Sequence, residues 1–170
     1  MASLIAEMEK CIPALRRYAS ALLRDRQEVD DLVHDCMVRA LDRLHTRRDD
    51  GDLRAWLFAI MRNLFISRIR RTRRCGVPEP IDTTDTVVLG QLANQEDPLR
   101  RRDLMRALDE LPEDQRSVLL LVAVEDLPYA ETARVLGVPI GTVMSRLSRA
   151  REKLRRSMGE EAPPALRRVK

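Results

Sequence analysis

Aromatic residues are scarce in this chain, since tryptophan, tyrosine and phenylalanine together make up 3% of its 170 residues. A hydrophobic core must therefore be built mainly from leucine, valine, isoleucine, methionine and alanine, and hydrophobic residues of all kinds reach 44% of the sequence. Aliphatic residues at helical spacing favour packed helices. The chain length is enough for one or two small domains.

Cysteine is also rare, with three residues in the chain and no CxxC pair. Because Cys11, Cys36 and Cys75 are widely spaced, we expect reduced thiols, the first two packed as small apolar residues. His34 and Cys36 lie two positions apart on a predicted helix, where their side chains point in different directions. We therefore predict neither a metal site nor a bound cofactor.

Long apolar stretches are missing as well. The longest run, Val118 to Val124, is far shorter than the ~20 residues needed to cross a bilayer. The N-terminal stretch MASLIAEMEKC is interrupted by acidic residues and has no signal-peptide core. We expect a cytoplasmic protein without membrane insertion.

Charge is distributed unevenly along a chain whose formal net charge is +4. The stretch 62–74 holds six arginines and no acid, and the stretch 146–156 holds six cations against Glu152 alone. The stretch 25–35 instead carries five acidic residues. Two basic surfaces and one acidic surface predict at least two kinds of partner, one of them a polyanion.

Two helices are predicted near the N-terminus, over 5–24 and 28–44. Pro13 lies near the middle of the first, and we expect a break or kink there because proline removes a helical hydrogen bond. The second helix has an apolar face made of Val29, Leu32, Val33, Cys36, Ala40, Leu41 and Leu44. A different face carries Asp31, His34, Asp35 and Val38. That face is either a docking surface for a basic helical partner or an ordinary solvated face.

A third helix is predicted over 53–74, with Asp52 as its N-cap. Its apolar face consists of Leu53, Trp56, Leu57, Ile60, Met61 and Leu64, so Trp56 is expected in the core. Beyond Arg62 a polar and basic stripe follows, formed by Asn63, Ser67, Arg70, Arg71 and Arg74. This stripe suits a DNA backbone, although a frayed, solvated helix end explains the charges too.

The segment 75–97 contains two prolines, two glycines and no lysine or arginine, and we read it as a linker between domains. Asp97 and Pro98 provide an N-cap and an N1 proline for a helix that runs to Leu111. A largely buried segment, 112–124, comes next. Residues 159–170 form a tail without a core. The prediction is an all-α protein with two small helical domains, 1–74 and 98–158.

Residues 129–156 have the features of a helix-turn-helix. A short helix over 129–136 is followed by Gly137, which allows a tight turn, and by Pro139, which favours a new helix start. The second helix buries Val143, Leu147, Ala150 and Leu154, spaced i, i+4, i+7 and i+11. Its other face carries Thr142, Ser145, Arg146, Arg149, Lys153 and Arg156. Polar groups at the start and cations further along suit a helix in the major groove, whereas a plain amphipathic hairpin is the alternative.

These motifs occur together and in a recognisable order. The stretches EVDDLVHDCMVRAL, LRAWLFAIMRNLFISRIRR, LPEDQRSVLLL and VPIGTVMSRLSRAR resemble the extracytoplasmic-function sigma factors of bacteria. The resemblance covers roughly residues 10–157. It implies a promoter-specificity subunit of RNA polymerase that is usually held inactive by an anti-sigma protein until a stress signal arrives.

The resemblance also implies roles for particular residues. The core polymerase would be bound through Asp30, Asp31, His34 and Asp35. The downstream (minus-ten) element would be bound by the stripe that begins with Asn63, which stands at a position the family uses for base recognition. The upstream (minus-thirty-five) element would be read through Thr142, Ser145, Arg146, Ser148 and Arg149, with Lys153 on phosphate.

Three positions depart from the family pattern. The family often has glutamine at His34, a capping serine at Pro128, and a basic or polar residue at Met144. A free-standing helix-turn-helix regulator is the main alternative, but such regulators usually dimerise and no heptad is visible. A metal-dependent nuclease would need a carboxylate cluster, and no set of nucleophile, base and orienting group appears. We therefore expect a binding protein without catalysis of its own.

Overall fold

The computed structural model describes residues 2–47, 51–75 and 98–159, and every regular element within these ranges is a helix, as predicted. The principal helices are α1 (Ala2–Leu22), α2 (Arg26–Asp42), α3 (Leu53–Cys75), α4 (Pro98–Asp109), α5 (Glu113–Leu119), α6 (Tyr129–Leu136) and α7 (Ile140–Ser157). A 3₁₀ turn, η1 (Leu44–Thr46), follows α2, and a π-helical turn, η2 (Leu120–Val124), continues α5. Of the predicted linker and tail, 76–97 and 160–170 lie outside the described residues.

The first helix is continuous across Pro13, so the predicted break is wrong. Proline at this position removes one backbone hydrogen bond from the ladder. Met8 and Leu15 are completely buried on either side of it, whereas Pro13 itself is exposed. Packing on both sides of the proline therefore keeps the helix continuous.

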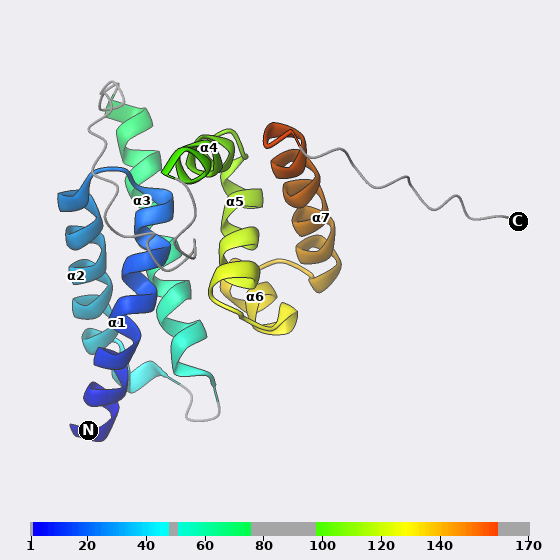
Figure 1. The fold of residues 1–170 in the computed structure, drawn as a ribbon. Coiled ribbons are helices and arrows are strands. Elements are labelled where there is room, and N and C mark those ends of the chain that lie inside the picture. Colours follow the sequence, from blue (N-terminus) through cyan, green and yellow to red (C-terminus); the bar gives the residue numbers. More distant parts are fainter. Residues whose placement is uncertain (1, 48–50, 76–97, 160–170) are drawn as a thin grey trace, which may run out of the picture.

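Helices α1, α2 and α3 form an antiparallel bundle with an aliphatic centre, as Figure 1 shows. Tyr18 and Phe58 supply its main aromatic contact, with ring centroids 5.3 Å apart at an interplanar angle of 74°. Trp56 is partly buried at the edge of this core. Leu41, predicted to point inward, is 47% exposed. It lies opposite the exposed Ile5, near the N-terminus of α1, where no described element covers the pair.

The helix-turn-helix forms as predicted. Gly137 ends α6 with φ 64°, a left-handed conformation that glycine adopts without steric cost. The amide of Val138 then donates to the carbonyl of Ala133, which closes the C-terminus of α6. Val143, Leu147 and Ala150 are buried on α7 and Leu154 is partly buried. Pro128 begins α6 without a side-chain cap, as its chemistry requires.

The two helical halves pack against each other in this structure. Helix α3 lies along α6, and α1 contacts η2. Buried residues of both halves belong to one continuous hydrophobic cluster. Figure 1 shows α5, α6 and α7 placed beside the bundle of α1, α2 and α3. The surfaces that could bind partners are therefore those left on the outside of this closed arrangement.

Candidate functional site

The acidic surface of α2 faces outward, as predicted. Asp31, His34 and Asp35 are exposed, and Val38 beside them is 45% exposed. Asp30 is less accessible, because its carboxylate pairs with the guanidinium of Arg16 at 3.1 Å. The structure thus brings three of the four predicted polar residues onto one open face.

Asp35 also connects this acidic surface to α3. The Arg68 guanidinium donates to its carboxylate at 2.6 Å and to the backbone carbonyl of Glu28 at 3.3 Å. Asp31 makes no ion pair within the described part of the chain. Asp31 is therefore the carboxylate most available to an incoming basic group.

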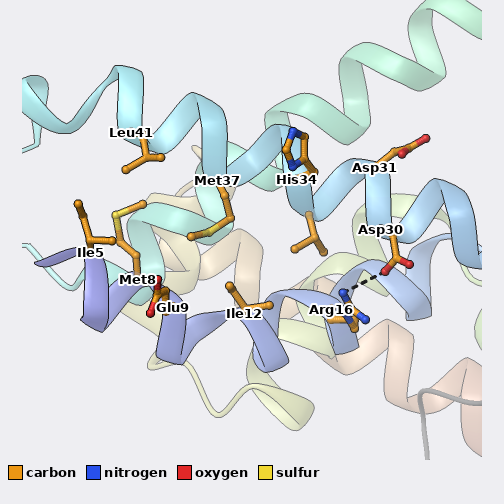
Figure 2. A pocket seen from close by; sticks show the side chains of 11 residues that line it. Ile5, Met8, Glu9, Ile12, Arg16, Asp30, Asp31, His34, Met37 and Leu41 are labelled. Atoms are coloured by element: carbon orange, nitrogen blue, oxygen red, sulfur yellow. Dashed lines mark ion pairs between the residues drawn. The ribbon is translucent and has the colours of Figure 1, made fainter. Parts of the chain in front are cut away.

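A groove of about 630 Å³ runs between α1 and α2 next to this surface, and Figure 2 shows its lining. Six apolar side chains form most of it, namely Ile5, Met8, Ile12, Val33, Met37 and Leu41. Asp31 and His34 belong both to the groove and to the acidic surface. Sequence reasoning missed the groove because it assigned Leu41 to the core. The run Val33, Met37 and Leu41, at i, i+4 and i+8, was the available signal.

The polar stripe of α3 is exposed along its whole length. Asn63, Ser67, Arg70, Arg71 and Arg74 are all exposed. The Ser67 hydroxyl donates to the carbonyl of Asn63 at 2.8 Å, so this serine is partly satisfied within its own helix. The amide group of Asn63 and the three arginines remain directed outward at the C-terminal half of α3.

The predicted residues of α7 divide into two groups. Ser145, Ser148 and Arg149 are exposed, and Arg149 makes no ion pair within the described residues. Thr142 is half-buried. Arg146 is held by Asp114 of α5 at 3.0 Å, and the Lys153 ammonium donates to the carbonyl of Glu110 beyond α4. The Ser145 hydroxyl donates to the carbonyl of Thr142 at 3.1 Å, so this serine is partly satisfied within its own helix. Ser148 and Arg149 are thus the exposed groups most available to a ligand, whereas Arg146 and Lys153 already have partners.

Two large apolar residues on α7 were not among the predicted site residues. Ile140 is 50% exposed and Met144 is 54% exposed. They lie one turn apart at the start of the helix, next to Ser145 and Ser148. Helical spacing alone was enough to place both residues at the edge of the buried stripe, where their side chains are about half exposed.

Comparison with known proteins accounts for both halves. Residues 101–154 match the family described as Sigma-70, region 4, and residues 8–62 match the family described as Sigma2 domain of PhyR. The ECF RNA polymerase sigma factor EcfG of Rhodopseudomonas palustris is 37% identical over 152 residues, which cover 89% of this chain and 83% of that protein. The chain belongs to the extracytoplasmic-function sigma factors.

Two solved structures share the fold of this sigma factor. The sigma factor RpoE of Bartonella quintana, crystallised with the anti-sigma factor NepR, aligns with a TM-score of 0.77 at 29% identity. That alignment covers 95% of this chain and all of the RpoE chain. CnrH, solved with the cytosolic domain of CnrY, aligns with a TM-score of 0.62 at 26% identity over 95% of this chain and 88% of CnrH.

A buried carboxylate joins the two halves of this sigma factor. Glu125, which follows η2, has no exposed surface. Its Oε1 accepts from Arg17 Nε at 3.2 Å, and its Oε2 accepts from Arg17 Nη2 at 2.9 Å. Arg54 Nη2 donates to the same Oε2 at 2.5 Å. Both arginines come from the N-terminal half, so this cluster is a fixed contact between the halves.

Two structural features are absent from the described residues. No helix among them is both long and apolar enough to span a membrane. Within the same ranges, no three histidine, cysteine, aspartate or glutamate side chains gather as metal ligands would.

Proposed function

We propose that residues 1–74 of this sigma factor bind core RNA polymerase and the minus-ten element, and that residues 98–158 bind the minus-thirty-five element. The observation that carries this assignment is the separation of one acidic surface, on α2, from two polar and basic surfaces, on α3 and α7. An acidic surface repels DNA and attracts a basic protein, whereas the other two attract phosphate. Three surfaces therefore serve one protein partner and two sites on one duplex.

Core polymerase docks on the face of α2 that exposes Asp31, His34 and Asp35, with Asp30 at its margin. The half-exposed Val38 adds apolar contact in the middle of this charged face. Charged groups around a small apolar centre are typical of a specific protein interface. A basic helix from the polymerase is the partner chemistry that fits.

The stripe on α3 engages the minus-ten element. Asn63 has an exposed amide that can pair with a base edge, whereas Arg70, Arg71 and Arg74 supply charge for phosphates. Ser67 adds a short hydroxyl between them. Base reading and backbone contact are thus placed in order along one helix.

The start of α7 enters the major groove at the minus-thirty-five element. Ser145, Ser148 and Arg149 are exposed where base edges would lie, with Thr142 beside them. Arg146 and Lys153 have partners within the chain, so they either exchange them for phosphate or hold α7 in place. Arg149 is the strongest candidate for direct base reading.

The closed arrangement must open for both elements to be bound together. Elements near minus ten and minus thirty-five are about 25 base pairs apart, which is roughly 85 Å along the duplex at ~3.4 Å per pair. A compact chain of this length has a radius of gyration of only about 15 Å. The packed structure therefore corresponds to an inactive form, in which the contacts at Glu125 hold the halves together.

An anti-sigma protein stabilises this inactive form until a stress signal releases it. The structural relative RpoE is bound to a protein of that kind, the anti-sigma factor NepR. The sigma factor then works in the cytoplasm, with core polymerase and promoter DNA as its partners, and has no catalysis of its own.

The deciding experiment mixes the purified chain with core polymerase and measures capture of the polymerase and promoter-dependent transcription in vitro. The sigma function predicts both, with weak promoter binding by the chain alone. Tight, dimeric, palindrome-specific binding in a gel shift without polymerase would instead support the free-standing regulator.

A further inference from the structure

The exposed face of α7 combines hydrogen-bonding and apolar groups at the end that precedes its arginines. Ile140 and Met144 are spaced i, i+4 and therefore lie one above the other on the helix surface. They are 50% and 54% exposed. Ser148 continues the same line one turn further, and Ser145 and Arg149 form the next row, about 100° further round the helix. The buried face, formed by Val143, Leu147 and Ala150, borders the apolar line on its other flank.

Neither apolar side chain contributes to the hydrophobic core. A polar residue at either position would cost the fold little, because exposed surface substitutions usually change stability only slightly. Two large apolar groups one turn from Ser148, a predicted base-reading residue, therefore point to a ligand that offers apolar surface itself. The exposed Arg149 and Arg151 on the same helix, with no acidic residue in 140–151, favour a ligand that is anionic overall.

DNA is anionic overall, and one of its bases, thymine, also offers an apolar group. The 5-methyl group of thymine is the apolar group that base pairs present in the major groove, and aliphatic side chains pack against it. Phosphate offers nothing to a thioether or an aliphatic chain, so these residues cannot act as backbone clamps. Methionine is unbranched and flexible, which lets one side chain follow a methyl group at a slightly variable position.

We propose that Met144, with Ile140 beside it, recognises thymine 5-methyl groups in the upstream promoter element. This inference rests on the proposed docking of α7 in the major groove and adds the base chemistry that it reads. Ser145 and Arg149 supply the hydrogen bonds to base edges, and Met144 supplies apolar discrimination between thymine and cytosine at a neighbouring pair. We therefore expect the upstream element to require an A·T pair at the position that Met144 contacts.

The test replaces each thymine of the upstream element in turn, on either strand, by deoxyuridine, which lacks only the methyl group. Binding of the reconstituted holoenzyme to each duplex is then measured. One or two replacements should weaken binding by about fourfold each, the effect of removing one buried methyl-sized group. With the Met144→Ala holoenzyme the same replacements should have no effect, because the contact is already lost.

Met158→Ala is the matched control, since Met158 is also exposed but lies at the C-terminal end of α7. This variant should keep the full deoxyuridine effect. Met144→Ala should also leave the dependence of log K on log salt unchanged, because no phosphate contact is removed. Circular dichroism of both variants checks that the helices are intact.

Several results would overturn the inference. If deoxyuridine had no effect while the holoenzyme still bound its promoter specifically, the proposed methyl contact would be refuted. The sigma function would not be affected by that result. An equal effect in the wild type and in Met144→Ala would assign the methyl to another residue. Weaker capture of core polymerase by Met144→Ala, with an unchanged deoxyuridine profile, would make the patch a protein contact. Failure of the wild-type holoenzyme to bind any promoter would refute the proposed function itself.

Discussion

The carboxylate of Glu125 accepts two hydrogen bonds from the guanidinium of Arg17, although 108 residues separate them in the chain. Arg54 completes the cluster from a second helix of the N-terminal half. The glutamate side chain has no exposure, whereas the side chains of Arg17 and Arg54 are 22% and 35% exposed. The buried charge thus depends on two groups that water can still reach. Such a contact is stable while paired and costly when one side is removed.

Removing both arginines should open the closed form. The Arg17→Ala, Arg54→Ala double variant leaves a buried, unpaired carboxylate, which costs about 3–5 kcal/mol if the halves stay packed. Separation of the halves relieves this cost, because Glu125 then reaches water. We expect a lower urea midpoint and a larger radius of gyration in small-angle scattering.

Arg24→Ala provides the control for this change. Arg24 also pairs across the halves, with Asp109, but both side chains are partly exposed. An exposed pair contributes roughly 0–1 kcal/mol, so compactness should hardly change. Equal compactness and stability of the double variant and the wild type would show that Glu125 does not hold the halves together.

Docking to polymerase is tested by Asp31→Lys. Asp31 is exposed and lies away from the apolar face, so the fold should be intact by circular dichroism. Affinity for core polymerase should fall at least tenfold, equivalent to about 1.4 kcal/mol. Asp42→Lys, at the exposed end of the same helix, makes the same charge change outside the acidic surface and should bind normally. If Asp31→Lys and the wild type bound core polymerase with equal affinity, the acidic surface of α2 would be an ordinary solvated face and not a docking surface.

Asp35→Lys gives a second, distinguishable result. Its carboxylate holds Arg68 at 2.6 Å, so a lysine there meets a like charge and also frees part of α3. Polymerase capture should be lost as with Asp31→Lys, and the Asp35→Lys, Arg68→Ala double variant should not restore it. Recovery in that double variant would show that the single change acts through α3 rather than through the docking surface.

Base reading by Arg149 is tested with upstream-element variants. Its planar guanidinium can pair with two acceptors of guanine, and it is exposed on α7. Arg149→Ala should therefore cost roughly 1–3 kcal/mol on the preferred element and much less on altered ones. The measurement is holoenzyme binding to the whole panel. Uniform weakening across the panel would make Arg149 a phosphate contact instead.

Lys153→Ala serves as the comparison on the same helix. If Lys153 contacts a phosphate, Lys153→Ala should weaken binding to every sequence alike and reduce the salt slope of log K by about 0.9. The structure places its ammonium on the carbonyl of Glu110, so this contact must first be exchanged. An unchanged salt slope would mean that Lys153 only anchors α7 to the end of α4.

Local patterns explain why most helices could be predicted. The apolar spacing of α7 and the glycine before it depend on neighbours within a few residues, and both appear as expected. Pro13 was misjudged because its local cost is visible in the sequence, whereas the packing of Met8 and Leu15 that offsets it is not. Leu41 was misjudged because a periodic pattern does not show where the neighbouring helix stops.

Contacts between distant segments were beyond such reasoning. Glu125 stands at the end of an apolar run, and nothing near it in the sequence indicates two arginine partners. Likewise Arg146 pairs with Asp114 of α5, and Lys153 donates to the carbonyl of Glu110 just after α4, which a charge count along α7 cannot reveal. The sequence therefore predicted which helix faces are exposed. It did not predict which side chains on those faces already have partners within the chain.

Alkaline pH should destabilise the folded chain through two buried groups. Burial raises the pKa of the Tyr18 hydroxyl from 10.0 to about 12, and burial raises the pKa of the Cys36 thiol from 9.0 to about 12. Both groups are neutral when protonated, so the unfolded chain releases these protons at lower pH than the folded chain. Their contribution to stability is complete below pH 9 and is lost as the pH rises towards 12.

Urea unfolding at pH 8, 9, 10 and 11 measures this loss, which should reach roughly 1.4 kcal/mol per pH unit for each group while only its unfolded form ionises. Tyr18→Phe keeps the ring that packs edge-on against Phe58 and removes one titration, so its stability should fall less steeply above pH 10. Cys36→Ala should flatten the curve from pH 9 upwards. If the wild type and both variants gave parallel curves of unfolding free energy against pH, neither group would resist ionisation in the folded state. That result would contradict the effect expected from the burial of both side chains.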